Sequence, residues 1–182
     1  MDLKFKLKTI SKDSIPEAVS KIELYRYLHE PEEAESICQD ILAADPGNQL
    51  ALRLLGLTLT DQFEGRHSDR YSEAQKIFQS LTDPYEVNYY TGLMLERRAK
   101  AQIRSGVAAH ILVGSLHEAM RCFEEAEKIR PPHNDDSVLR WNRCVRLLEK
   151  LEHEPKEPRQ SVFDDEDTAP IEIRTRPGGR AR

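Results

Sequence analysis

The sequence predicts an all-α protein built from consecutive helical hairpins. Apolar residues recur at helical spacing through most of residues 14–150. Glycine is scarce, with 8 residues in 182, which disfavours the turn-rich all-β classes. Finally, a small residue followed four positions later by a larger apolar one recurs in "EAESICQDI", "EAQKIFQSL" and "EAMRCFEEA". These three observations favour pairs of helices that cross closely at small side chains.

The first predicted hairpin spans residues 14–45. Ser14 and Glu17 have the spacing of a capping box. The apolar face of the first helix is formed by Ala18, Ile22, Tyr25 and Leu28. The apolar face of the second is formed by Ala34, Ile37, Cys38, Ile41 and Leu42. Pro31 suits the first turn of the second helix, and Pro46 follows its end.

The second predicted hairpin begins at Leu50. Its first helix carries Leu52, Leu55, Gly56 and Leu59, and its second carries Ala74, Ile77, Phe78 and Leu81. The polar stretch "DQFEGRHSDR" is predicted to connect them.

The third hairpin begins at Asp83, which is predicted to cap a long helix with Pro84 in its first turn. Gly106 is predicted to end that helix. Residues 107–114, "VAAHILVG", are predicted to be an unusually apolar connection that either packs back on the helices or docks a partner. Ser115 and Glu118 then have capping-box spacing for a helix with Ala119, Phe123 and Ala126, stopped by Pro131 and Pro132. Asp136 or Ser137 is predicted to cap a last helix.

The two ends differ from the middle in composition. Residues 1–13 form a basic arm with alternating lysines and apolar residues, which favours a short strand or a disordered arm. Residues 14–153 form the helical domain. Residues 154–182 hold prolines, an acidic block at 164–167 and a basic end, and are predicted to be a disordered charged tail because they cannot bury enough apolar surface.

The hairpin pattern resembles the tetratricopeptide repeat (TPR) family over roughly residues 14–150. The resemblance implies a right-handed solenoid of about three helical hairpins plus a capping helix that contains Trp141 and Cys144. The spacing departs from the family pattern in two places. Relative to the first repeat, the second carries about six extra residues and the third about fifteen, which predicts either longer helices or larger loops. A non-repeating helical bundle is the alternative fold.

No catalytic motif was found in the sequence. It lacks a nucleophile elbow, a glycine-rich phosphate loop and paired metal-ligand motifs, so we expect no enzyme activity, no cofactor and no metal. Cys38, Cys122 and Cys144 fall in predicted helices and are interpreted as small buried residues. The start lacks the apolar run of a signal peptide, which favours a cytoplasmic location.

The resemblance implies a non-enzymatic scaffold or adaptor that holds a peptide or helix of another protein in a groove lined by the first helices. The predicted groove residues are Glu23, Arg26, Tyr27, Arg53, Leu57, Tyr89, Leu93 and Arg97, with Val19, Thr60 and Glu86 at neighbouring positions. Exposed aromatics and leucines among arginines are typical of protein-binding surfaces. The alternative interpretation is that Leu57 and Leu93 belong to the core and that the charges form an ordinary solvated face.

The sequence argues against two other kinds of binding, that of a chaperone carboxylate and that of nucleic acid. The chaperone-binding subtype of the family clamps a carboxylate with lysine, asparagine and arginine, whereas the matching positions here hold Val19, Glu23, Leu54, Glu86 and Tyr90. Nucleic-acid binding has support from two basic stretches, Arg97–Arg104 and Arg140–Arg146, but the net charge of −5 opposes it. The remaining alternatives are a nucleic-acid-associated repeat protein and a structural subunit of a larger assembly. No membrane partner is predicted.

Overall fold

The computed structural model describes residues 5–64 and 69–153. Within these ranges the chain forms a short 3-10 turn and seven α-helices, and no strand. The helices are α1 (Ile15–Tyr27), α2 (Pro31–Ala44), α3 (Gln49–Asp61), α4 (Arg70–Gln79), α5 (Pro84–Arg104), α6 (Ala109–Lys128) and α7 (Asp136–His153). The all-α prediction is therefore confirmed for the described part of the chain.

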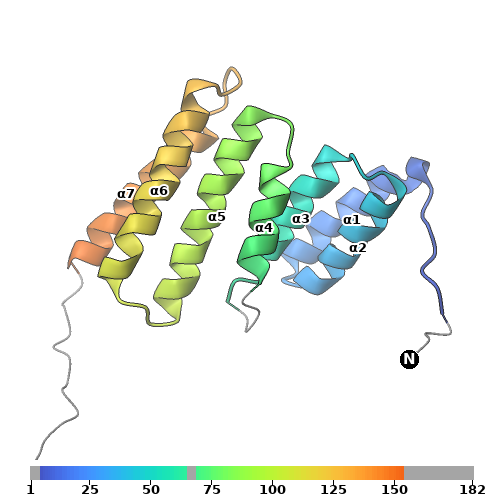
Figure 1. Cartoon of the computed structure of the whole chain (residues 1–182), viewed down its shortest axis with the longest axis horizontal. Helices are drawn as coiled ribbons and strands as arrows, with labels where there is room; N and C mark the ends of the chain where they lie inside the picture. Colours follow the sequence, from blue (N-terminus) through green and yellow to red (C-terminus); the bar gives the residue numbers. More distant parts are fainter. Residues whose placement is uncertain (1–4, 65–68, 154–182) are drawn as a thin grey trace, which may run out of the picture.

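The helices follow one another along the long axis of the molecule in chain order (Figure 1). Each helix packs against the next, so that α1–α2, α3–α4 and α5–α6 are antiparallel pairs and α7 covers the last pair. The odd-numbered helices also contact one another, α1 with α3, α3 with α5 and α5 with α7. They therefore form a continuous row, called here the odd row, and any surface that draws on several hairpins is expected on it.

Close helix crossings explain the recurring small residues. Ala34, Ala74 and Ala119 are completely buried. A Cβ atom placed on Gly56 would lie 2.3 Å from Cε1 of Phe78, and one placed on Gly92 would lie 2.8 Å from Cε1 of Phe123. Each glycine therefore leaves the space that a phenylalanine ring of the facing helix fills.

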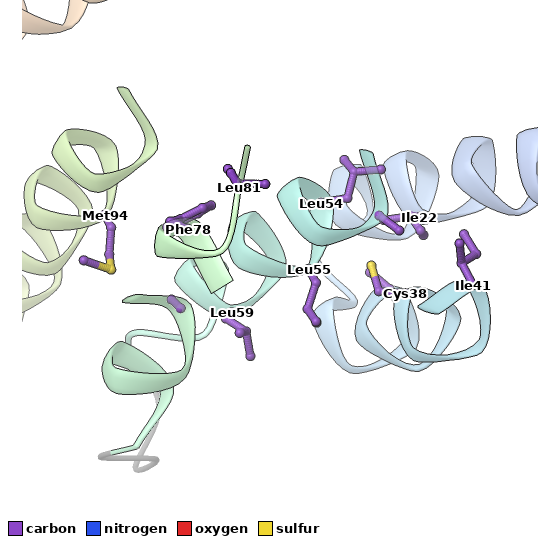
Figure 2. Packing of buried hydrophobic residues seen from close by; sticks show 12 residues of the cluster. Ile22, Cys38, Ile41, Leu54, Leu55, Leu59, Phe78, Leu81 and Met94 are labelled. Atoms are coloured by element: carbon purple, nitrogen blue, oxygen red, sulfur yellow. The ribbon is translucent and has the colours of Figure 1, made fainter. Parts of the chain in front are cut away.

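The first hairpin reverses this pairing. Ile22 stands where α3 and α5 have glycine, and Cys38 stands where α4 and α6 have phenylalanine. Both side chains are fully buried in one core cluster (Figure 2). In this hairpin the larger side chain, Ile22, thus comes from the first helix, and the smaller one, Cys38, comes from the second. The two helices exchange the large and small positions, so that the crossing is still filled.

The core is divided into two clusters along the row. One is formed by α1–α4 and includes Met94 of α5 (Figure 2), and the other is formed by α5, α6 and α7. Leu57, Tyr71 and Tyr90 pack against both clusters. These three side chains join the two halves of the protein into one packed body.

The prediction for residues 107–114 was wrong. Residues 109–114 belong to α6, which begins at Ala109 and runs without interruption to Lys128, and only 107–108 lie in the short connection 105–108 that separates it from α5. Leu112 is 1% exposed and Ile111 is 60% exposed. The apolar stretch is therefore the amphipathic first part of a helix, and its apolar character is explained by packing.

Three of the predicted caps were also wrong. Ser115 lies inside α6 and caps nothing. Ser14 does precede α1, but its hydroxyl donates to the carbonyl of Ser11 at 2.8 Å and makes no capping bond. At the start of α7 the side chain of Asn134, rather than Asp136 or Ser137, accepts the Asp136 N–H at 2.9 Å. By contrast, Asp83 caps α5 as predicted, accepting the Tyr85 N–H at 2.9 Å.

The two insertions have different structural forms. In the second hairpin α3 and α4 have 13 and 10 residues, so the extra residues lie in the connection between them. In the third hairpin α5 and α6 have 21 and 20 residues, so the extra residues lengthen the helices. At the amino end, residues 5–11 form neither helix nor strand, and Phe5 and Leu7 are exposed. The predicted tail, 154–182, lies outside the described residues.

Candidate functional site

The odd row carries a pocket at the carboxyl ends of α1, α3 and α5. Its volume is about 540 Å³. The lining residues are Glu23, Arg26, Tyr27 and His29 near the end of α1, Thr60, Asp61, Phe63 and Glu64 near the end of α3, Arg97, Lys100, Ala101 and Arg104 of α5, and Arg140 of α7. Four separate helices therefore contribute to one concave site.

A shared carboxylate organises the middle of this pocket. Asp61 accepts from Nε of Arg26 at 2.7 Å through Oδ2, and its Oδ1 accepts from Nη1 of Arg97. The same Nη1 also donates to the hydroxyl of Thr60 at 2.7 Å. Burial lowers the pKa of the Arg97 guanidinium, and the nearby Asp61 charge offsets part of that effect. Asp61 thus connects α1, α3 and α5 and fixes two guanidinium groups side by side.

A second, buried carboxylate lies beneath the pocket. Glu96 is 0% exposed, its Oε1 forms an ion pair with Lys100, and its Oε2 lies 3.6 Å from Nη1 of Arg140. Burial by itself lowers the pKa of Arg140, but contact with the Tyr89 hydroxyl and the charge of Glu96 outweigh burial and raise it. A buried carboxylate requires such compensation, because an unpaired buried charge is strongly unfavourable. Glu96 therefore holds two cations at the pocket.

The rim of the pocket remains available to a ligand. Tyr27 is 81% exposed, and Glu23 is also exposed. Arg104 pairs with Glu64 across the opening between α5 and α3. Altogether the lining holds five arginine or lysine side chains and three acidic ones. The arrangement suits recognition of anionic groups by positioned cations, next to an exposed aromatic ring.

The structure separates the eight predicted groove residues into two sets. Glu23, Arg26, Tyr27 and Arg97 line the pocket. Arg53 instead pairs with Glu86 at 2.6 Å, Tyr89 stacks on Tyr85 with ring centroids 5.7 Å apart, and Leu57 packs between the two core clusters. Leu93 is 3% exposed and belongs to the core. A test of partner binding should therefore use the pocket set, because changing Leu93 would alter packing.

The sequence did not assign Asp61, Arg140 or the buried Glu96 to the groove, although two of these three residues left a signal. Glu96 lies four residues after Gly92 and three before Ala99, on the buried face of α5. Arg140 lies on the stripe of α7 that also holds the buried residues Ser137 and Cys144. A charged residue at a buried stripe position indicates an ion pair inside the fold. Asp61 left no comparable signal, since it occupies the exposed end of α3.

Other reactive groups lie away from the pocket. Burial raises the pKa of the Cys38 and Cys144 thiols to about 12. Burial also raises the pKa of Cys122, which is only partly buried. No group of three or more potential metal ligands occurs among the described residues. Likewise, none of the helices in residues 5–64 and 69–153 is long and apolar enough to cross a bilayer.

No family model matches the chain, and no curated protein matches it.

Proposed function

We propose that this chain is a TPR-like solenoid that acts as a non-enzymatic protein-binding scaffold, with the pocket on the odd row as the centre of partner contact. The pocket itself is the observation that supports this proposal, since it gathers residues from four helices into one concave, charged site. The odd row corresponds to the first helices of the hairpins, which line the partner groove in the family that the sequence resembles.

The pocket has properties that favour association. Asp61 and Glu96 hold Arg97, Arg26, Lys100 and Arg140 in place before any ligand arrives. Pre-organised side chains lose less conformational entropy on binding than free ones. Tyr27 adds an exposed aromatic surface beside these charges, and tyrosine and arginine are the residues most often found at the energetic centre of interfaces.

The proposal is tested by affinity capture with the full-length chain as bait. The pocket variant combines Tyr27→Ala with Glu23→Ala, both at exposed positions where truncation should leave the fold intact. The control variant, Leu139→Ala, removes an apolar side chain that is 62% exposed on α7 and does not line the pocket. Captured proteins are quantified by mass spectrometry, and helicity is checked by circular dichroism.

We expect the pocket variant to lose specific proteins that wild type and Leu139→Ala both retain. Equal recovery by all three baits would contradict the proposed location of the site. Recovery of no specific protein by the wild-type bait would contradict the scaffold function itself.

A further inference from the structure

We propose that the pocket binds an acidic peptide segment, and that its occupant in the free protein is the chain's own acidic block, residues 164–167. This inference concerns the isolated chain and does not depend on the proposed scaffold function.

The cations of the pocket are only partly used by the fold. Both contacts of Arg97 are made through Nη1, and in the described part of the chain no hydrogen bond is found from its Nε or Nη2. Arg140 contacts the Tyr89 hydroxyl, and it approaches Glu96 at 3.6 Å, which is longer than a hydrogen bond. Guanidinium groups with free donors in a concave site match carboxylates, which accept in pairs.

The charge balance favours an anion over a cation. Five cationic side chains line the pocket against three acidic ones, and the fully buried Glu96 beneath them already has Lys100 and Arg140 as partners. Asp61 is likewise shared by two arginines. Each of these two acids is shared by two cations, and Arg104 is balanced by Glu64. Together with Glu23, the five cations therefore face four acids, and an arriving carboxylate meets a net charge of +1.

The acidic block is the complementary segment that the chain itself supplies. Residues 164–167 are Asp-Asp-Glu-Asp, four consecutive carboxylates preceded by Phe163. Phe163 offers an apolar ring next to the charges, as Tyr27 does at the pocket rim. Charge and aromatic character therefore match on both sides.

The chain length allows this contact. The helix α7 ends on the same side of the molecule as the carboxyl end of α5, which lines the pocket (Figure 1). From Arg140 to the end of α7 at His153 the helix extends about 20 Å at 1.5 Å per residue. The eleven residue steps from His153 to Asp164 can span up to about 36 Å. A chain of this length is long enough for the acidic block to reach the pocket within the same molecule.

The experiment uses the full chain and NMR signals of the arginine Nε–H groups. In the test variant the block is neutralised by Asp164→Asn, Asp165→Asn, Glu166→Gln and Asp167→Asn. In the control variant the same charge is removed from exposed positions of α6 outside the pocket by Glu118→Gln, Glu124→Gln, Glu125→Gln and Glu127→Gln. We expect the Arg97 and Arg140 signals to shift in the test variant and to stay in place in the control.

A second measurement uses a labelled peptide of residues 160–170 added to the full chain. Neutralising the block should strengthen peptide binding by about threefold or more, because an internal competitor has been removed. A peptide with the four neutral residues should not bind measurably.

The outcomes separate the possible occupants. Unshifted arginine signals together with unchanged peptide affinity would overturn the proposal. The proposal would also be overturned if the difference in the Arg97 and Arg140 signals between wild type and the test variant disappeared on dilution. In that case the block would be bound by a second copy of the chain. Shifts that are independent of protein concentration and are lost at high salt would support it.

Discussion

Two glycines determine how closely the helices of the second and third hairpins approach one another. At Gly56 and Gly92 the phenylalanine of the facing helix occupies the space that a Cβ would need. A glycine in a helix interior is unfavourable by about 0.5–1 kcal/mol relative to alanine. At these two positions the glycine allows a phenylalanine ring to be fully buried, which offsets that cost.

We predict opposite effects for two glycine-to-alanine changes. Gly56→Ala should lower the free energy of unfolding by about 1–3 kcal/mol, because the new methyl group clashes with the Phe78 ring. Gly114→Ala in α6 should raise it by up to about 1 kcal/mol, since no atom lies within 4 Å of the added Cβ. Urea unfolding of both variants checks this. Equal stability of Gly56→Ala and wild type would show that the crossing is looser than described.

Two buried thiols should make the protein sensitive to alkaline pH. The pKa of Cys38 and Cys144 is about 12 in the folded state, against 9.0 for an unperturbed thiol. Between these two pH values the unfolded chain releases the two thiol protons, whereas the folded chain keeps them. The free energy of unfolding is therefore unaffected by these thiols below about pH 9, and it falls as the pH rises toward 12. We predict that Cys38→Ala shows a smaller decrease of Tm between pH 8 and about pH 10.5 than wild type. Parallel Tm curves would contradict this assignment.

At the scale of elements, the third hairpin is distinguished by the length of its helices. α5 and α6 are 21 and 20 residues long, and the extension of α5 carries Lys100, Ala101 and Arg104 into the pocket. The connection between them is only residues 105–108, with Gly106 at φ +82°. That left-handed conformation favours glycine and allows a tight return to α6. The length of α5 therefore builds one wall of the pocket.

The first turns of α6 are expected to contribute to stability on one face only. Leu112→Ala should lower the free energy of unfolding by about 2–5 kcal/mol, because Leu112 is 1% exposed. Ile111→Ala should change it by no more than about 0.5 kcal/mol, because Ile111 is 60% exposed. Thermal unfolding of the two variants is the measurement. A similar loss in both would mean that Ile111 is covered by a partner or a second copy.

At the scale of the whole molecule, polar contacts supplement the stacking of hairpins. Asp61 of α3 binds Arg26 of α1 and Arg97 of α5, so a single carboxylate connects three hairpins along the odd row. Contacts of this kind are absent from a simple pairwise stack, in which each helix meets only its neighbours through apolar faces. Asp61 therefore both organises the pocket and adds a polar link between α1, α3 and α5.

We predict that Asp61→Ala destabilises the protein by about 1–3 kcal/mol, since it leaves two guanidinium groups without their shared acceptor. Glu118→Ala is the matched control, because it removes an exposed partner of Arg121 and should change stability by less than about 0.5 kcal/mol. Chemical unfolding measures both. If the two variants were equally stable, Asp61 would serve ligand binding alone and not the fold.

The sequence by itself determined the helical class, the number of hairpins in the described residues and the crossing residues Ala34, Ala74 and Ala119. These features follow from local periodicity and from short-range patterns such as Asp83–Pro84, whose physical effect is exerted within one or two turns. The start of α6 was misplaced because Ser115 and Glu118 have capping-box spacing, while packing of Leu112 extends the helix past that signal.

Only the tertiary structure decided the composition of the pocket. Arg26, Asp61, Arg97 and Arg140 come from four helices and are as much as 114 positions apart in the chain. It also decided that Arg53 and Tyr89 do not line the pocket and that Leu93 is buried. Charged side chains at helix ends have no periodic signature, because their partners are chosen by the register and crossing of neighbouring helices. That register is set by side-chain packing along the whole row.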